Sequence, residues 1–226
     1  AEHLPQGPYP TAAPEICKAL RLTQQYFCAS CSLQDMLRIY LQHRDRLEGL
    51  HEKFVVQLND THPAIAVAEL MRLLVDQHGL AWERAWDITR RTFAFTNHTL
   101  LPEALETWPV DLIGRLLPRH MEIIHEINHR FLNEVRVRFP GDRGRIARLS
   151  LIDDSGSQHV VRMAHLATVG SFAVNGVAAL HTRLLKATVM QDFSELWPEK
   201  FHNVTNGVTP RRFLRMINPG LDMLIS

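Results

Sequence analysis

Two short apolar runs, each ending in a cluster of small polar residues, constrain the fold of this chain more than any other feature. FVVQL (54–58) runs into NDTHP (59–63), and TFAF (92–95) runs into TNHT (96–99). Each pattern is typical of a buried strand that feeds a helix, because a proline soon after the polar cluster suits a first helical turn. In open α/β sheets, ligands gather at such strand ends. The sequence therefore predicts an α/β fold with a ligand site near Asn59, Asp60, His62, Asn97 and His98.

Patterns elsewhere in the chain alternate between helices and strands. Apolar residues recur at three- and four-residue steps over 18–47, and further helices are predicted near 63–77, 81–93 and 119–138. Residues 149–153 and 159–162 flank the turn sequence DSGS and predict a hairpin. The nearly uncharged run AHLATVGSFAVNGVAALH, residues 164–181, predicts one or two buried helices. Such alternation indicates a helix-rich α/β protein.

Composition and charge exclude several classes of protein. The chain has 226 residues, of which 46% are hydrophobic and 22% are charged, as in folded globular proteins. A net charge of +1 gives no broad positive surface for nucleic acid. No apolar run reaches the roughly 20 residues that cross a bilayer. Three cysteines cannot complete a disulfide framework, so we expect a cytoplasmic protein. From the charge and the apolar runs, we expect neither nucleic-acid nor membrane partners.

Two further patterns match metal or redox signatures, and both are explained by helix geometry. Residues 125–129, HEINH, match the H-E-x-x-H pattern of zinc peptidases. A helical wheel places His125 and His129 opposite the apolar stripe of their helix, where they face solvent. Cys28 and Cys31 form a C-x-x-C pair inside a helical run with no second pair nearby, and we expect them to be half-buried. The sequence therefore predicts no metal site.

Four segments in the chain carry a family resemblance. They are LNDTHPAIAVAELMR, FTNHTLLPEALETWPVDL, MAHLATVGSFAVNGVAALH and NVTNGVTPRRFL. In this order and spacing they resemble the α-glucan (glycogen) phosphorylase family, especially its bacterial members, from about Tyr9 to the last residue. The resemblance implies an internal fragment of a two-domain, glycosyltransferase-B-like architecture with Rossmann-like sheets. Residues 1–172 would be the closing part of the first domain, and residues 173–226 the beginning of the second.

The resemblance also implies an activity for the intact protein. Members of this family use inorganic phosphate to cleave an α-1,4-glucan (glycogen, starch or maltodextrin), and they release glucose 1-phosphate with retention at the anomeric carbon. They need pyridoxal 5′-phosphate, whose lysine would lie beyond Ser226, so no cofactor-binding residue is expected in this chain. A homodimer is expected for the intact enzyme. The alternative is a non-catalytic glucan-binding or interface fragment, and a zinc hydrolase using HEINH is a third reading.

His98 and Asn175 are the main candidate site residues. Taken alone, His98 is typical of a capping residue in a turn, and Asn175 of a buried amide or helix start in an apolar helical run. By resemblance, the His98 side chain holds the 6-hydroxyl of the sugar. Its main-chain carbonyl has a catalytic role, since a fixed dipole facing the anomeric carbon stabilises an oxocarbenium-like transition state. Also by resemblance, Asn175 grips the glucosyl unit through an amide that both donates and accepts.

Four more residues complete the predicted substrate site. Asp60 and His62 follow the first strand, where capping is the plainer explanation for an Asp-x-His pair. Arg21 and Glu106, as lone charges, would ordinarily lie on the surface. By resemblance, all four residues line the cleft beside the glucosyl unit and position it.

Two expectations concern the ends of the chain. Residues 11–17, TAAPEIC, stand where the family has a polar, acidic loop, and Ala12 and Ala13 cannot hydrogen-bond a sugar, so we expect weaker control of substrate access. Near the other end, Thr209 and Pro210 predict a helix start. Residues 173–226 contain apolar segments, such as VNGVAALHTRLL and LDMLI, but too few strands to form a second sheet that would cover these segments. We therefore expect the 226-residue chain alone to self-associate, to bind no pyridoxal phosphate and to turn over nothing.

Overall fold

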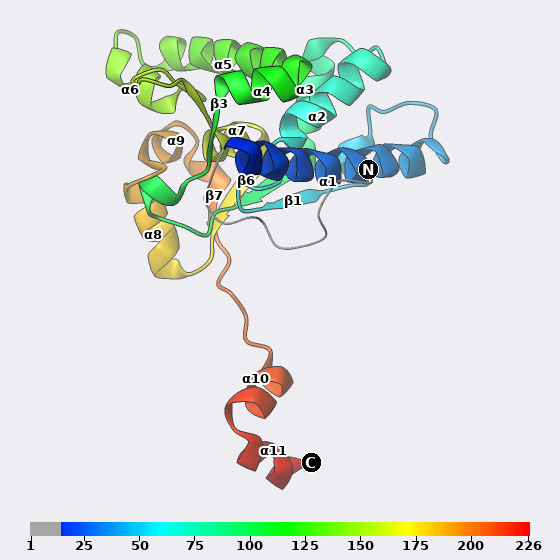
Figure 1. Cartoon of the computed structure of the whole chain (residues 1–226), viewed down its shortest axis with the longest axis vertical. Coiled ribbons are helices and arrows are strands. Elements are labelled where there is room, and N and C mark those ends of the chain that lie inside the picture. Colours follow the sequence, from blue (N-terminus) through cyan, green and yellow to red (C-terminus); the bar gives the residue numbers. More distant parts are fainter. Residues whose placement is uncertain (1–14) are drawn as a thin grey trace.

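A four-stranded parallel sheet forms the centre of the protein, in a computed structural model that describes residues 15–226 (Figure 1). The strand order is β1-β2-β6-β7, with bounds Val56–Asn59, Phe93–Thr96, Ser171–Gly176 and Phe201–Asn203. All three neighbouring pairs are parallel. The strands predicted at 54–58 and 92–95 are thus confirmed with shifts of one or two residues, and the α/β class is confirmed.

Helices connect the strands and cover the sheet. The α-helices are α1 (Glu15–Leu41), α2 (Ala66–Arg72), α3 (Trp82–Thr92), α4 (Val110–Leu116), α5 (Pro118–Arg138), α6 (Arg143–Leu149), α7 (Met163–Val169), α8 (Ala179–Ala187), α9 (Gln191–Leu196), α10 (Pro210–Ile217) and α11 (Pro219–Ile225). One π-helical turn, Leu73–Gln77, extends α2, and 3-10 turns occupy Leu50–Glu52, Pro102–Ala104 and Pro198–Lys200. The predicted first helix therefore begins at Glu15 and ends at Leu41, not near residue 47. The helix predicted to start at Pro210 is confirmed.

A second, antiparallel sheet has the order β3-β5-β4. Its strands are β3 (Thr107–Pro109), β5 (Val160–Arg162) and β4 (Ile152–Asp153). The predicted hairpin is confirmed, because β4 pairs antiparallel with β5. β3 was not predicted, since a three-residue strand that ends in proline carries almost no periodic signal.

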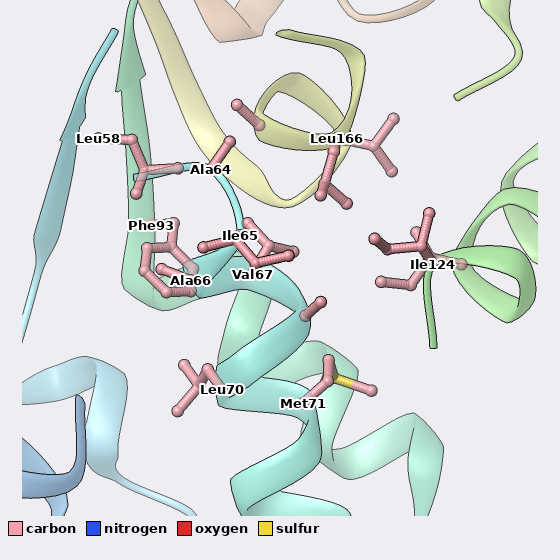
Figure 2. Close-up of a cluster of buried hydrophobic side chains, with 14 of the residues drawn as sticks. Leu58, Ala64, Ile65, Ala66, Val67, Leu70, Met71, Phe93, Ile124 and Leu166 are labelled. Atoms are coloured by element: carbon pink, nitrogen blue, oxygen red, sulfur yellow. The ribbon is translucent and has the colours of Figure 1, made fainter. Parts of the chain in front are cut away.

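The core lies where α2 packs against the parallel sheet (Figure 2). Leu58 and Phe93 come from β1 and β2, while Leu70 and Met71 come from α2, and all four are fully buried. α2 also packs against α1 and α5, so one short apolar helix lies between the sheet and two long helices. Gly170, after α7, lies so close to α2 that an added Cβ would stand 2.5 Å from a methyl carbon of Val67.

The segment 164–181 corrects the prediction of one or two continuous buried helices. Met163–Val169 and Ala179–Ala187 are helical, but Ser171–Gly176 between them is β6. β6 lies between β2 and β7, and Val174 at its middle is fully buried. β6 is six residues within a longer, nearly uncharged run, and Phe172 in it is 45% exposed. Periodicity alone does not distinguish a short apolar strand of this kind from a buried helix. Asn175 is therefore a strand residue.

Several remaining expectations can be compared with the structure. Cys28 and Cys31 are both exposed on α1, which corrects the expectation that they are half-buried. His125 and His129 are exposed on α5, as the helical wheel predicted. Residues 11–14 of the altered loop lie outside the described residues. Within residues 15–226, no helix has both the length and the apolar character that crossing a membrane requires.

The last two helices lie apart from the rest of the molecule, at the end of an extended segment, 204–209 (Figure 1). No residue of α10 or α11 is buried. The predicted domain boundary between 172 and 173 falls inside β6, and β7 continues the same sheet as far as Asn203. The assignment of 173–226 to a second domain stays a prediction for a longer protein.

Candidate functional site

Three strand ends meet at the carboxyl edge of the parallel sheet. Asn59, Thr96 and Asn175 are aligned in one row across β1, β2 and β6. Main-chain hydrogen bonds continue the row beyond the strands: Asp60 N–H donates to the Thr96 carbonyl and Asn97 N–H to the Asn175 carbonyl, both at 3.0 Å. The structure therefore brings together the polar clusters that follow the two apolar runs, as the sequence predicted.

His98 is exposed at this edge, and Asn59 holds its ring. His98 Nε2 lies 2.6 Å from Asn59 Oδ1. An amide oxygen only accepts, so Nε2 carries the proton in this arrangement. In the neutral form of the ring, Nδ1 is then an acceptor, because the two nitrogens have opposite roles. His98 is thus oriented to accept a hydrogen bond from a ligand hydroxyl.

Asn175 is already engaged by its neighbours. Its Oδ1 accepts from Thr96 Oγ1 at 2.8 Å and from Gln57 Nε2 at 3.5 Å, and its Nδ2 donates to the Gly176 carbonyl at 3.0 Å. Gln57 Nε2 also donates to Thr96 Oγ1 at 2.8 Å. An amide nitrogen has two N–H donors, so Asn175 has one left to offer a ligand.

Asp60 adopts a strained turn between β1 and α2. Its φ is 66°, and it is the one non-glycine residue with positive φ among residues 15–226. Its Oδ1 accepts from the Thr61 main-chain N–H at 2.6 Å and from Thr61 Oγ1 at 3.2 Å. Asp tolerates the left-handed conformation because its short side chain bonds the local backbone. α2 begins only at Ala66 and has no side-chain cap, so Asp60 stabilises a local turn and does not cap the helix. Contact of Asp60 with a substrate stays a prediction.

Arg21 and Glu106, far apart in sequence, form an ion pair with a nitrogen-to-oxygen distance of 3.2 Å. Gln25 Nε2 donates to the same Glu106 oxygen, Oε1, at 2.9 Å. The Glu106 side chain is only 10% exposed, so it is not the surface residue that a lone charge suggests. Gln25 and His62 both line a cavity of about 250 Å³ between α1, β1 and the start of α2. One region therefore contains Arg21, Glu106 and His62.

Gln25, Gln57, Thr96 and His181 were missed by the sequence reasoning. The signal for Gln25 is its position one helical turn after Arg21, on the same face of α1. His181 Nδ1 accepts from the Val177 main-chain N–H at 3.4 Å. Burial, and then the nearby charge of His98, lower the pKa of His181, which favours its neutral form. Thr96 belongs to the polar cluster TNHT, but no local pattern indicates its contact with Asn175 or marks Gln57, because the partners of both residues come from different strands.

Gly176 allows α8 to begin directly against this edge. A Cβ at this position would lie 2.4 Å from Thr182 Oγ1 and 2.9 Å from Thr182 Cα. Only glycine permits such a close approach of a helix to a strand end. This explains the short connection between β6 and α8, which places His181 beside His98.

Two of the four described lysines, Lys53 and Lys200, are not placed to form a Schiff base with a cofactor at this edge. Lys53 and Lys200 precede β1 and β7, at the opposite edge of the sheet. Lys200 is buried, its Nζ stacks on Trp197 at 3.9 Å from the ring centroid, and it donates to the Thr168 carbonyl at 3.3 Å. Within residues 15–226, no group of three or more His, Cys, Asp or Glu side chains suits a metal ion.

The fold and the polar residues at the carboxyl edge of the sheet define an open α/β protein, a class in which ligands bind where the parallel strands end. Side chains such as His98, Asn59 and Asp60, which donate or accept, suit a ligand rich in hydroxyl groups. A family model described as carbohydrate phosphorylase matches residues 1–226, so the chain belongs to that family.

Similar proteins from distant organisms extend this result. The chain is 62% identical over 226 residues to a glycogen phosphorylase of Synechocystis sp.. It is 50% identical over 234 residues to the muscle form of glycogen phosphorylase from Bos taurus. It is 49% identical over 234 residues to the liver form from Homo sapiens. The matches cover 100% of this chain but only 26% of the first protein and 28% of the other two. The chain thus spans about a quarter of the length of these relatives.

Proposed function

We propose that the longer protein containing this sequence breaks down α-1,4-glucans with inorganic phosphate and releases glucose 1-phosphate with retention of configuration. The match of the family model to every residue carries this proposal. The relatives described above, all glycogen phosphorylases, support it. The hydroxyl-directed groups at the carboxyl edge of the sheet are chemically consistent with a sugar ligand.

In this proposal His98 is the residue nearest the reaction. Asn59 fixes its Nε2–H, so Nδ1 accepts a hydrogen bond from a sugar hydroxyl. The His98 main-chain carbonyl faces the anomeric carbon, where positive charge develops. A dipole already held in place stabilises that charge without reorganisation.

The other predicted residues position the sugar. Asn175 offers its remaining N–H, while Asp60 and His62 follow β1 on the approach to the site. Arg21 and Glu106 form one wall of the cleft, and Gln25 holds Glu106 in place. Because Asn175, Asp60 and Glu106 are each already held by hydrogen bonds to neighbouring residues, they bind with little loss of side-chain entropy.

Pyridoxal phosphate, when bound, supplies a phosphate group that transfers the proton. We place its lysine and the residues that handle inorganic phosphate in the part of the longer protein beyond Ser226. This chain contributes sugar orientation and the exclusion of water. A cytoplasmic homodimer is part of the same proposal.

A second candidate is a non-catalytic glucan-binding or interface role for this chain by itself. The observation that favours it is the exposed apolar surface of α10 and α11, which includes Met216, Ile217 and Leu224. Purified longer protein, loaded with pyridoxal phosphate and given glycogen and inorganic phosphate, separates the two. Glucose 1-phosphate release that depends on glycogen is expected. A fully loaded protein that releases none would exclude the phosphorylase proposal.

A further inference from the structure

A small cavity lies between α3, α5 and the end of α9. Its volume is about 70 Å³. Its floor consists of buried apolar side chains, its walls are three of the four tryptophans, and its rim carries two arginines and a glutamate. In that order, the lining residues are Ile127, Phe131 and Val169; Trp82, Trp86 and Trp197; and Arg90, Arg130 and Glu134. We call it the tryptophan cavity.

Arg90 has unused hydrogen-bond donors at this cavity. Its guanidinium carbon lies 6.0 Å from the ring centroid of Trp86 and 5.6 Å from that of Trp197. Among the described residues, no carboxylate lies within 4.0 Å of its nitrogens, and no hydrogen bond engages them. Arg130 differs, because Glu83 and Glu126 both pair with it. The two tryptophan rings therefore hold the Arg90 guanidinium in place without neutralising it.

Three other groups around the cavity are a buried donor, a buried lysine and an exposed carboxylate. The buried Nε1–H of Trp82 has no hydrogen-bond partner within the described residues. Lys200, buried behind Trp197, stacks its Nζ on the same ring. Glu134 is exposed and accepts from Trp197 Nε1 at 3.3 Å, so it is held at the rim. Leaving a buried donor without a partner is unfavourable, and a ligand that only accepts hydrogen bonds would remove that cost.

We propose that the tryptophan cavity binds one small inorganic anion, held by the Arg90 guanidinium and the Trp82 indole N–H. The volume corresponds to about two water molecules, each about 30 Å³ in the liquid, and is too small for a sugar ring. An aromatic box of this kind can also hold a cation, but here Arg90 already occupies that position. The site is separate from the carboxyl edge of the sheet and does not depend on the proposed function.

Quenching of tryptophan fluorescence by iodide tests this proposal, because iodide is both a small anion and a collisional quencher. We expect a saturable component of quenching in the unmodified protein. Inorganic phosphate or chloride, added at constant ionic strength, should remove that component. Acrylamide, a neutral quencher, should show no saturation. Acetate reports whether an organic carboxylate fits the same cavity or only inorganic anions do.

Variants assign the effect to Arg90. Arg90→Gln should weaken the saturable component about tenfold, the effect of losing a charge-assisted hydrogen bond. Arg90→Lys should retain part of it, because the charge remains but the planar donor fork is lost. Arg84→Gln, an exposed position on another face of α3, is the matched control and should leave quenching unchanged.

Two results would overturn the proposal. One is iodide quenching in the unmodified protein that is linear and insensitive to phosphate and chloride. This result does not depend on whether any variant folds. The other is an equal loss of the saturable component in Arg84→Gln and Arg90→Gln, which would show a general surface-charge effect. Neither result bears on glucan phosphorolysis, since the readout is anion binding at a different place in the fold.

Discussion

At the scale of single residues, the hydrogen bond between His98 and Asn59 gives the sharpest test of the proposed site. In the longer enzyme, His98→Ala should lower kcat/KM by about 10²–10³, equivalent to about 3–4 kcal/mol, because a contact that tightens in the transition state is lost. His78→Ala, an exposed histidine in the turn before α3, is the control. Steady-state kinetics on glycogen check the prediction, and near-normal activity in His98→Ala would reduce His98 to a structural role.

The buried Lys200 makes the free energy of unfolding depend on pH. Burial, followed by the charge of Arg90, lowers its pKa from 10.5 to about 7. Between these two values the unfolded chain holds a proton that the folded chain does not, so stability rises with pH across this window. Below about pH 7 both states are protonated, and the folded state bears the full cost of a buried charge.

Lys200→Met should therefore stabilise the protein at pH 6, on the order of 1–4 kcal/mol, and should do so much less at pH 10. Denaturant unfolding at the two pH values measures the difference. Lys53→Met, at an exposed position, is the control and should show no such dependence. An equal gain at both pH values would mean that Lys200 is not the titrating group.

At the scale of elements, the buried carboxylate of Glu69 ties three helices together. It accepts from Ser30 of α1 at 2.6 Å and from Arg72 of α2 at 2.8 Å, and it lies 2.6 Å from His120 Nε2 of α5. Burial raises the pKa of Glu69, but hydrogen bonds from His120, Arg72 and Ser30 outweigh it and lower the pKa to about 2. Its stabilising contribution is thus present above about pH 4.5 and is lost as pH falls towards 2.

Glu69→Gln should lower the free energy of unfolding by about 3–5 kcal/mol at pH 7, because it leaves Arg72 without a counter-charge in a buried site. Glu122→Gln, on the exposed face of α5, is the matched control. Urea denaturation of both variants provides the comparison. Similar losses in the two variants would contradict the idea that the buried network holds α1, α2 and α5 together.

Gly170 determines how closely α7 approaches α2. Gly170→Ala should destabilise the protein by about 1–3 kcal/mol, because its Cβ would stand 2.5 Å from Val67 Cγ1. Gly114→Ala in α4 has open space around the new methyl group and should be neutral or stabilising by about 0.5–1 kcal/mol. Adding Val67→Ala to Gly170→Ala tests the mechanism. Failure of that double variant to recover stability would place the strain elsewhere.

At the scale of the whole molecule, α10 and α11 present apolar side chains to solvent. Met223 and Leu224 of α11 are 77% and 82% exposed. Exposed patches of this kind mark interaction surfaces. We predict that the 226-residue chain alone self-associates and retains no pyridoxal phosphate after desalting. Sedimentation velocity and cofactor absorbance measure the two properties, and a monomer with stoichiometric cofactor would contradict both.

Local patterns were enough to predict much of the fold and part of the site. β1 and β2 were predicted because each couples an apolar run to a polar cluster, and both signals lie within ten residues of sequence. The location of Asn59, Asp60 and His98 at one edge followed from the geometry of parallel strands. β6 was missed, because it is a short strand inside a longer apolar run, and periodicity alone cannot distinguish such a strand from a buried helix.

By itself, the sequence determined the α/β class, the two strand ends that bear the candidate site, and the family resemblance. Only the tertiary structure decided what the site residues bind to. Asn175 is restrained by Thr96 and Gln57, which lie 79 and 118 positions away in the chain. Glu106 is buried by Arg21 and Gln25 from α1. Periodicity reports the environment of a residue relative to its neighbours along the chain, whereas hydrogen-bond partners that are distant in sequence are chosen by the packing of whole elements.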